Sequence, residues 1–107
     1  MSRLVNPLQG RRQSLMEFEY DPEKSRSNRT KHGIDFIEAQ RLWERPVVEI
    51  ETPRPPEMRY VCIGVIDGNH WSAIITYVGS RRRIISVRQS TENEINHYAS
   101  KTAPRRR

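Results

Sequence analysis

The second half of the chain alternates between apolar and polar residues with the two-residue period of β-strands. Three runs rich in β-branched residues predict strands over 58–66, 70–78 and 81–89, and a shorter run predicts another over 47–52. The turns between the last three strands contain Asp67-Gly68-Asn69 and Gly79-Ser80, which are typical of hairpins. The pattern therefore predicts an antiparallel sheet.

The residues before this sheet predict a short strand over 17–20 and then a helix. Asp21 is a favoured helix cap, Pro22 suits the first helical position, and Gly33 is a typical residue just after a helix end. The body of this helix, residues 24–30, is polar on every side, which is unusual for a helix that packs on a sheet. We therefore expect it to lie on the surface or to meet a partner.

Two further helices flank the sheet in sequence. Asp35 with Glu38 is a plausible capping pair for a second helix, which ends at Pro46. Thr91 with Glu94 repeats that capping pattern before a short amphipathic helix. The order β-α-α-β-β-β-β-α predicts an α+β domain. In it, two N-terminal helices and a short C-terminal helix pack on one face of the antiparallel sheet.

The chain has 107 residues, enough for one domain with a modest core. We expect this domain to span residues 16–101. Residues 1–15 are interpreted as a disordered basic arm or an alternative-start extension, and residues 102–107 as a basic tail. The arm and the tail carry the whole net charge of +6, because acidic and basic residues cancel between them. The high isoelectric point therefore belongs to the two ends.

Two absences in the sequence narrow the class of protein. No run of about 18 apolar residues and no signal-peptide segment are found, so we expect a cytoplasmic protein without a membrane partner. The lone Cys62 excludes an internal disulfide and a cysteine-based metal site, and its apolar neighbours indicate a buried, inert thiol.

The stretch from Arg81 to Arg88 combines a buried-type strand with several arginines. A guanidinium is rarely buried without a partner, so such a strand must carry its cations to an open surface. Arginine suits phosphate because its planar group binds two oxygens at once. The alternative is an edge strand that charge protects from pairing.

The two predicted hairpin loops also determine which side chains share a face of the sheet. If Gly68-Asn69 and Gly79-Ser80 are two-residue loops, one face of the sheet is aliphatic and carries the helices. The opposite face then collects Trp71 and Tyr77 together with Arg88. Aromatic rings stack on bases while arginine holds phosphate, so this face suits RNA. Arg82, Trp71 and Tyr77 are accordingly candidate RNA-binding residues.

Lys31 and His32 are candidates for proton transfer. Histidine is the side chain best matched to proton transfer near neutral pH. With Arg59, Arg83 and Arg88, these two residues would supply what RNA cleavage needs without a metal ion or other cofactor. A purely structural interpretation is also open, because basic residues favour the negative end of a helix.

The remaining polar residues offer fewer functional signals. The scattered histidines His32, His70 and His97 have no metal-ligand spacing. Glu94 is most simply a capping residue and Tyr98 a half-buried packing residue, and both are kept as candidates for a supporting role.

Four pieces of the sequence, in this order, resemble the BrnT family. The resemblance covers about residues 17–100. The pieces are Phe18-Glu19-Tyr20-Asp21-Pro22-Glu23-Lys24; Lys31-His32-Gly33-Ile34-Asp35-Phe36-Ile37-Glu38-Ala39; Glu57-Met58-Arg59-Tyr60 with Ile63-Gly64; and Arg83-Ile84-Ile85-Ser86-Val87-Arg88 followed by Glu94 and Tyr98.

The resemblance implies a type II toxin with a RelE-like fold that cleaves RNA without a metal and stops translation and growth. It also implies a BrnA-type antitoxin, and a toxin–antitoxin complex that binds its own promoter DNA. Carried over by position, the active site draws on Lys31, His32, Arg59, Arg83 and Arg88. The alternative function is a non-catalytic nucleic-acid-binding module whose arginines only hold phosphate.

Overall fold

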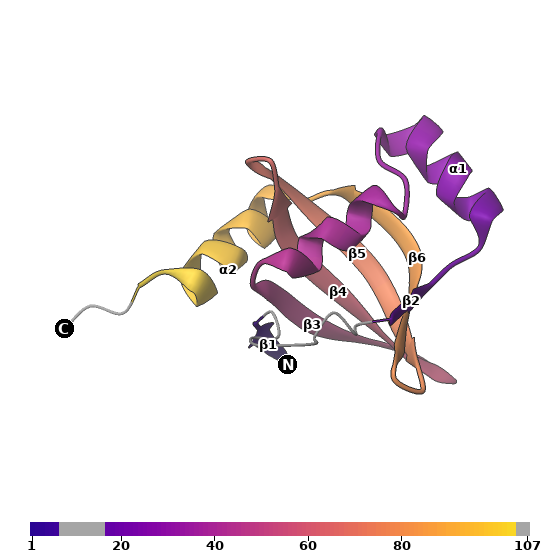
Figure 1. Ribbon diagram of the computed structural model, residues 1–107. Helices are drawn as coiled ribbons and strands as arrows, with labels where there is room; N and C mark the ends of the chain where they lie inside the picture. The colour runs from indigo at the N-terminus through magenta and orange to yellow at the C-terminus, as the bar shows by residue number, and fades with distance from the viewer. Residues whose placement is uncertain (7–16, 105–107) are drawn as a thin grey trace.

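The computed structural model describes residues 1–6 and 17–104, which form one mixed sheet with helices around it (Figure 1). The sheet is six-stranded, in the order β1-β3-β4-β5-β6-β2. Its strands are β1 (Ser2–Val5), β2 (Glu17–Glu19), β3 (Val47–Arg54), β4 (Glu57–Ile66), β5 (Asn69–Val78) and β6 (Arg81–Gln89). Neighbouring strands are antiparallel except β2, which runs parallel to β6. The predicted antiparallel sheet is corrected to a mixed one.

Only one of the two predicted N-terminal helices is an α-helix. Helix α1 (Pro22–His32) is an α-helix, but the second predicted helix is a 3₁₀ helix, η2 (Glu38–Glu44), and α2 (Glu92–Thr102) closes the domain. Phe36, Ala39 and Leu42 are fully buried and recur every three residues. That spacing matches the three residues per turn of a 3₁₀ helix. The prediction of two N-terminal α-helices on the sheet is therefore wrong.

The helices also lie on both faces of the sheet. A side chain at Gly64 would reach within 2.7 Å of Leu42 Cδ2, so η2 packs directly on the Gly64 side of β4. Glu94 of α2 instead accepts a hydrogen bond from Ser72, whose strand partner is Ile63, the neighbour of Gly64. Because successive residues of a strand point to opposite faces, α2 lies on the other side of the sheet. The prediction that all helices share one face is wrong.

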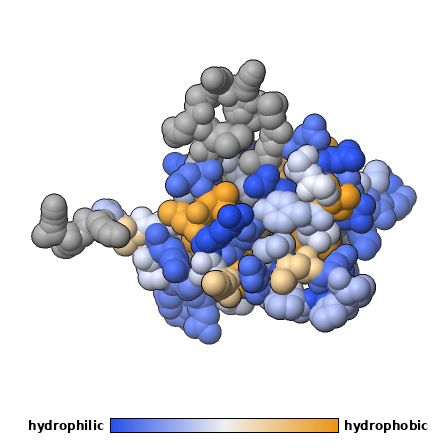
Figure 2. All heavy atoms as spheres, turned by 90° about the horizontal axis from the view of Figure 1, so that it is seen from below, coloured by the Kyte–Doolittle hydropathy of each residue, from blue (hydrophilic) through white to orange (hydrophobic). Residues whose placement is uncertain are grey.

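The main core lies between η2 and the sheet. Its members are buried residues of the segment before η2, of η2 itself and of the strands: Ile34, Phe36, Ala39, Leu42, Trp43, Val47, Cys62, Ile66, Ala73, Ile75, Ile84 and Val87. Cys62 is buried as predicted, and burial raises the pKa of its thiol. Hydrophilic residues cover most of the side shown in Figure 2, with small apolar patches between them.

Helix α1 is held to the sheet by polar side chains, which explains its polar sequence. Asn28 donates to the carbonyl oxygens of Ile34 (2.8 Å) and Val87 (2.9 Å), and it accepts from the N–H of Val87 (3.1 Å). Its amide therefore takes the place of a strand partner beside β6. Ser25 Oγ accepts from the N–H of Phe36 at 2.9 Å. The capping residues act as predicted, since Asp21 accepts from the N–H of Glu23 and Gly33 has a φ of 82°.

The N-terminal residues are partly ordered into the sheet. Ser2–Val5 pair with β3 as strand β1, whereas a disordered arm is predicted for residues 1–15. Residues 7–15 of that arm, residue 16 and residues 105–107 of the predicted tail lie outside the described residues. Among the residues that are described, no helix is long and apolar enough to cross a membrane.

Candidate active site

A bulge in β6 decides which arginines share a face of the sheet. The β5–β6 hairpin turns at Gly79-Ser80 and pairs Thr76 with Arg83, both as predicted. Further along, Ile75 pairs with Ile84 but Ile74 pairs with Ser86, so Ile85 is an extra residue without a partner. The bulge reverses the alternation of every later residue in β6. Arg83 and Arg88 therefore lie on the same face, although they are five positions apart and a regular strand would put them on opposite faces.

We call the open part of this face, around Arg59, Arg83 and Arg88, the arginine surface. Arg88 pairs with Ser72, next to α2, and Arg83 pairs with Thr76 further from α2. Arg59 lies on this side because the ring of its neighbour Tyr60 packs on the opposite side. The three arginines predicted to act in catalysis thus share one face of the sheet, although the partners of Arg88 and Arg83, Ser72 and Thr76, lie four residues apart along β5.

The three residues predicted to bind RNA lie on the other face, which η2 covers. The guanidinium of Arg82 lies 5.7 Å from the ring centre of Trp43 and 5.5 Å from that of Tyr77. Arg82 Nε is buried without a hydrogen-bond partner among the described residues. Trp71 is partly buried against the main core. An RNA-binding role for Arg82, Trp71 and Tyr77 stays a prediction, and the open face predicted to combine Trp71 and Tyr77 with Arg88 is not formed.

These residues are covered because η2 packs on the face that was predicted to be open, and the bulge separates them from Arg88. The predicted loop Gly68-Asn69 is in fact Asp67-Gly68, since Ile66 pairs with Asn69, but this shift of two residues leaves the faces of β4 and β5 unchanged. The bulge at Ile85 then moves Arg88 to the opposite face from Tyr77. Tyr77 donates to Glu49, and burial together with that hydrogen bond raises the pKa of Tyr77 to about 12.

Glu94 fixes Arg88 in place. Its two carboxylate oxygens accept from the terminal nitrogens of Arg88 at 2.8 and 2.9 Å, and Ser72 Oγ donates to it at 2.9 Å. The N–H of Thr91 also donates to Glu94, which completes the predicted capping box of α2. Arg88 and these donors lower the pKa of Glu94 to about 2 against the opposing effect of burial. Glu94 is therefore a fixed anion at neutral pH, and it raises the pKa of Arg88.

Carboxylates also hold the other two arginines of the arginine surface. Arg83 donates through Nε to Glu19 of β2 at 2.7 Å, and Arg59 donates through Nε to Glu57 at 2.9 Å. A guanidinium has five N–H donors, so each ion pair leaves donors for a second anion. The side chains of Arg83 and Arg88 are 51% and 37% exposed, which leaves them accessible to a ligand.

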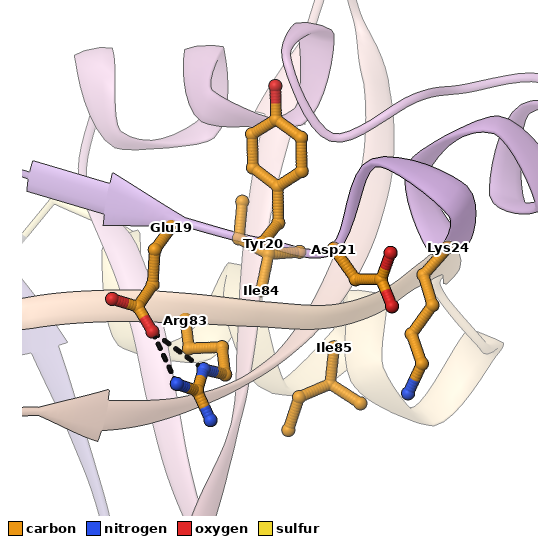
Figure 3. A pocket seen from close by; sticks show the side chains of 7 residues that line it. All are labelled: Glu19, Tyr20, Asp21, Lys24, Arg83, Ile84 and Ile85. Carbon is orange, nitrogen blue, oxygen red and sulfur yellow. Dashed lines mark hydrogen bonds and ion pairs between the residues drawn. The ribbon is translucent and has the colours of Figure 1, made fainter.

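Helix α1 adds lysines beside this surface. Lys24 lines an open pocket with Arg83 and Ile85, and Figure 3 shows these side chains on the same side of β6. Lys24, Asn28 and Lys31 follow the four- and three-residue spacing of one helix side. Since Asn28 binds Val87, we infer that Lys31, one turn further along, lies level with Arg88.

His32 is placed differently from Lys31. Each residue of an α-helix is rotated by 100° from the one before it, so His32 lies on the same side of α1 as Ser25. The hydroxyl of Ser25 binds Phe36, so this side of α1 faces the main core. Both Lys31 and His32 are exposed. Lys24 was missed by the sequence analysis, because its position beside Arg83 depends on how β2 and α1 follow the edge of β6. The only sequence signal is its helical spacing from Lys31.

Tyr98 contacts the sheet rather than the arginines. Its hydroxyl donates to the carbonyl oxygen of Pro46 at 3.1 Å, its ring packs edge-on against His70 at 5.4 Å, and burial raises its pKa. Over residues 1–6 and 17–104, no three histidine, cysteine, aspartate or glutamate side chains gather as metal ligands.

Comparison with known proteins gives one family. The family model for the ribonuclease toxin BrnT of type II toxin–antitoxin systems matches residues 20–94. No curated protein matches the chain. The matched span begins just after Glu19 and ends at Glu94, so it contains Lys24, Lys31 and all three residues of the arginine surface. The chain therefore belongs to the BrnT family of ribonuclease toxins of type II toxin–antitoxin systems, as its sequence motifs predict.

Proposed function

We propose that the chain is a metal-independent endoribonuclease that cleaves RNA on the arginine surface. The bulge at Ile85, which brings Arg83 and Arg88 to one open face, is the observation that carries this proposal. In such a reaction the RNA 2′-hydroxyl gives its proton to a water molecule, its oxygen bonds to the adjacent phosphorus, and the bond from phosphorus to the 5′-oxygen breaks. Negative charge builds on the phosphate oxygens during this step. Preorganised cations stabilise that charge more than water does, because they need no reorganisation during the reaction.

Each residue of the arginine surface binds a phosphate group of the RNA in this proposal. Arg83 and Arg88 bind the oxygens of the cleaved phosphate through the N–H groups that Glu19 and Glu94 leave free. Arg59, at the far rim, binds a neighbouring phosphate. The three carboxylates hold the guanidinium groups in one orientation before RNA arrives, which avoids an ordering cost on binding.

Lys31 is the residue that we assign to proton transfer. It lies on the Lys24 side of α1, toward the arginine surface, and an ammonium group is a proton donor at neutral pH. We propose that it protonates the departing 5′-oxygen. His32 lies on the other flank of α1, so its role is the lesser one.

The cellular consequences follow from RNA cleavage in the cytoplasm. We propose that translation and growth stop when the toxin is free. An antitoxin of the BrnA type prevents this arrest by covering the arginine surface and the C-terminal end of α1. Its acidic side chains are attracted there by the exposed basic side chains of the toxin. We further propose that the complex of the two proteins binds its own promoter DNA.

The test is induced expression without antitoxin, followed by growth curves and by mapping of cleaved RNA ends. Wild type should arrest growth and cleave RNA, whereas Arg88→Ala and Arg83→Ala should not. Lys31→Ala should lower the cleavage rate by at least about 100-fold, the size of a typical general-acid contribution, and His32→Ala should lower it less.

The matched control is Arg26→Ala. Arg26 is exposed, lies on the side of α1 away from Asn28, and pairs only with Glu23 of the same helix within the described chain. It should arrest growth like wild type. If folded wild-type protein bound RNA in a salt-dependent way but cleaved none, the non-catalytic binding module would replace this proposal.

A further inference from the structure

A pocket of about 370 Å³ opens between β2, the start of α1 and the bulge of β6 (Figure 3). Its size lies within the range of small-molecule sites. Arg83 belongs both to this pocket and to the arginine surface. We propose that the pocket binds the nucleotide next to the cleaved phosphate and selects a base that carries an amino group. This inference rests on the proposed function, because it takes Arg83 as the contact to the cleaved phosphate.

The bulged residue Ile85 supplies the apolar wall. It has no partner in β5, is partly buried, and lies beside Lys24 and Arg83 on the same side of the strand in Figure 3. A nucleobase is a flat ring with two apolar faces, so it gains by covering such a side chain. The residue that brings Arg83 and Arg88 to one face thus also forms a surface on which a base can lie.

Lys24 supplies the charge for a second phosphate. It makes no ion pair with any described residue, unlike Arg83, which Glu19 holds. Consecutive phosphates of an RNA strand lie on either side of one nucleotide. Arg83 and Lys24 lie at two sides of the pocket, so the two can bind the phosphates that flank one base.

Asp21 supplies the selectivity. Its Oδ1 accepts from the N–H of Glu23 at 2.9 Å, which fixes the side chain at the start of α1. Within residues 1–6 and 17–104 its Oδ2 has no hydrogen-bond partner, and Asp21 lines the pocket. A carboxylate oxygen accepts hydrogen bonds only, so it favours bases with an exocyclic amino group. Guanine, adenine and cytosine have that group and uracil lacks it.

The experiment measures binding without cleavage. The probes are short fluorescent oligonucleotides with 2′-O-methyl groups, made of A, C or U alone, and binding is followed by fluorescence polarisation. Lys24→Ala should weaken binding of every probe several-fold and lower the slope of log affinity against log salt by about 0.7, the value for one lost phosphate contact. Lys101→Ala on α2, an exposed lysine outside the pocket, is the matched control and should bind like wild type.

The second variant is Asp21→Asn, which keeps the cap because asparagine caps helices as well as aspartate does. Wild type should bind the A and C probes several-fold more tightly than the U probe, and Asp21→Asn should bind all three about equally. Unchanged base preference in Asp21→Asn, or an unchanged salt slope in Lys24→Ala, overturns the pocket assignment even if RNA cleavage is found.

Failure of the proposed function would look different. Absence of cleavage with intact base-selective binding removes the ribonuclease mechanism but leaves the pocket as a nucleotide site. If both variants lost affinity for the antitoxin and kept wild-type binding of every oligonucleotide, the pocket would be a protein contact and the inference would be wrong.

Discussion

Arg88 and Glu94 form a two-point ion pair, at 2.8 and 2.9 Å, that joins strand β6 to helix α2. The same carboxylate caps α2 through Thr91 and accepts from Ser72 at the centre of the sheet. One side chain thus links the fold of the C-terminal helix to the orientation of a candidate catalytic arginine. Substitutions at Glu94 separate these two roles.

We expect Glu94→Gln to keep the fold and to lose most of the cleavage. Glutamine completes a capping box as glutamate does, so α2 should persist. It cannot hold the guanidinium of Arg88 by charge, so Arg88 should become mobile and the cleavage rate should fall by at least about tenfold, which is about 1.4 kcal/mol of transition-state stabilisation. Single-turnover cleavage assays at saturating enzyme measure this loss. Glu92→Gln, in the same helical turn but without a described contact to Arg88, is the control.

The lowered pKa of Glu94 makes stability depend on pH in acid. Its folded pKa is about 2, below the usual 4.5, so the ion pair stabilises the folded state above about pH 4.5. That stabilisation should be lost progressively as the pH falls from 4.5 toward 2. Urea unfolding of wild type and Glu94→Gln at pH 7, 4 and 3 measures it. Wild type should be more stable at pH 7, and the difference should shrink with acidity; a constant difference would contradict the assignment.

Asn28→Ala should loosen α1 from the sheet. The change removes three hydrogen bonds and leaves the N–H and C=O of Val87 without their partner. Unpaired buried polar groups cost about 1–3 kcal/mol each, so the free energy of unfolding should fall by roughly 2–4 kcal/mol. Hydrogen exchange should show faster exchange at Val87 and in α1 than at the β3–β4 pairing. The exposed Asn96→Ala on α2 should show neither effect.

Gly64→Ala tests the close packing of η2 on β4. The new methyl group would lie 2.7 Å from Leu42 Cδ2, which is too close for carbon atoms. Overpacking of this kind typically costs about 1–3 kcal/mol, and chemical denaturation measures it. Combining the change with Leu42→Val, which removes volume next to the new methyl, should cost less than the sum of the two single changes. Additive costs would show that the two residues are not in contact.

The parts of the fold that follow from local sequence were predictable. The hairpin at Gly79-Ser80, the caps at Asp21 and Thr91 and the end of α1 at Gly33 all depend on residues a few positions apart. Strand β1 was not predicted, because its partner β3 lies more than forty residues away and no local signal marks the pairing. The face occupied by η2 was likewise not predicted, because it is set by the contact of Leu42 with Gly64, a strand residue more than twenty positions away.

The candidate site was predictable in its residue types but not in its arrangement. Arginine next to β-branched residues indicated a cationic strand, and the family motif supplied the same residues. The bulge has no such signal, because Ile84 and Ile85 are both β-branched and either could be the extra residue. A regular strand would have put Arg88 with Tyr77, as the register argument predicted. One unpaired residue therefore decided which aromatic and cationic side chains share a surface.

The amide of Asn28 also covers part of an open strand edge of the sheet. Strand β2 spans only Glu17–Glu19, so it covers β6 no further than Arg83. Beyond Arg83, the side chain of Asn28 is hydrogen-bonded to the N–H and C=O of Val87. Helix α1 therefore blocks the edge of β6 at which a strand of another molecule would pair. Unpaired strand edges template edge-to-edge growth into aggregates. We therefore expect loss of Asn28 to shorten the time in which purified protein stays monomeric, as well as to weaken the fold.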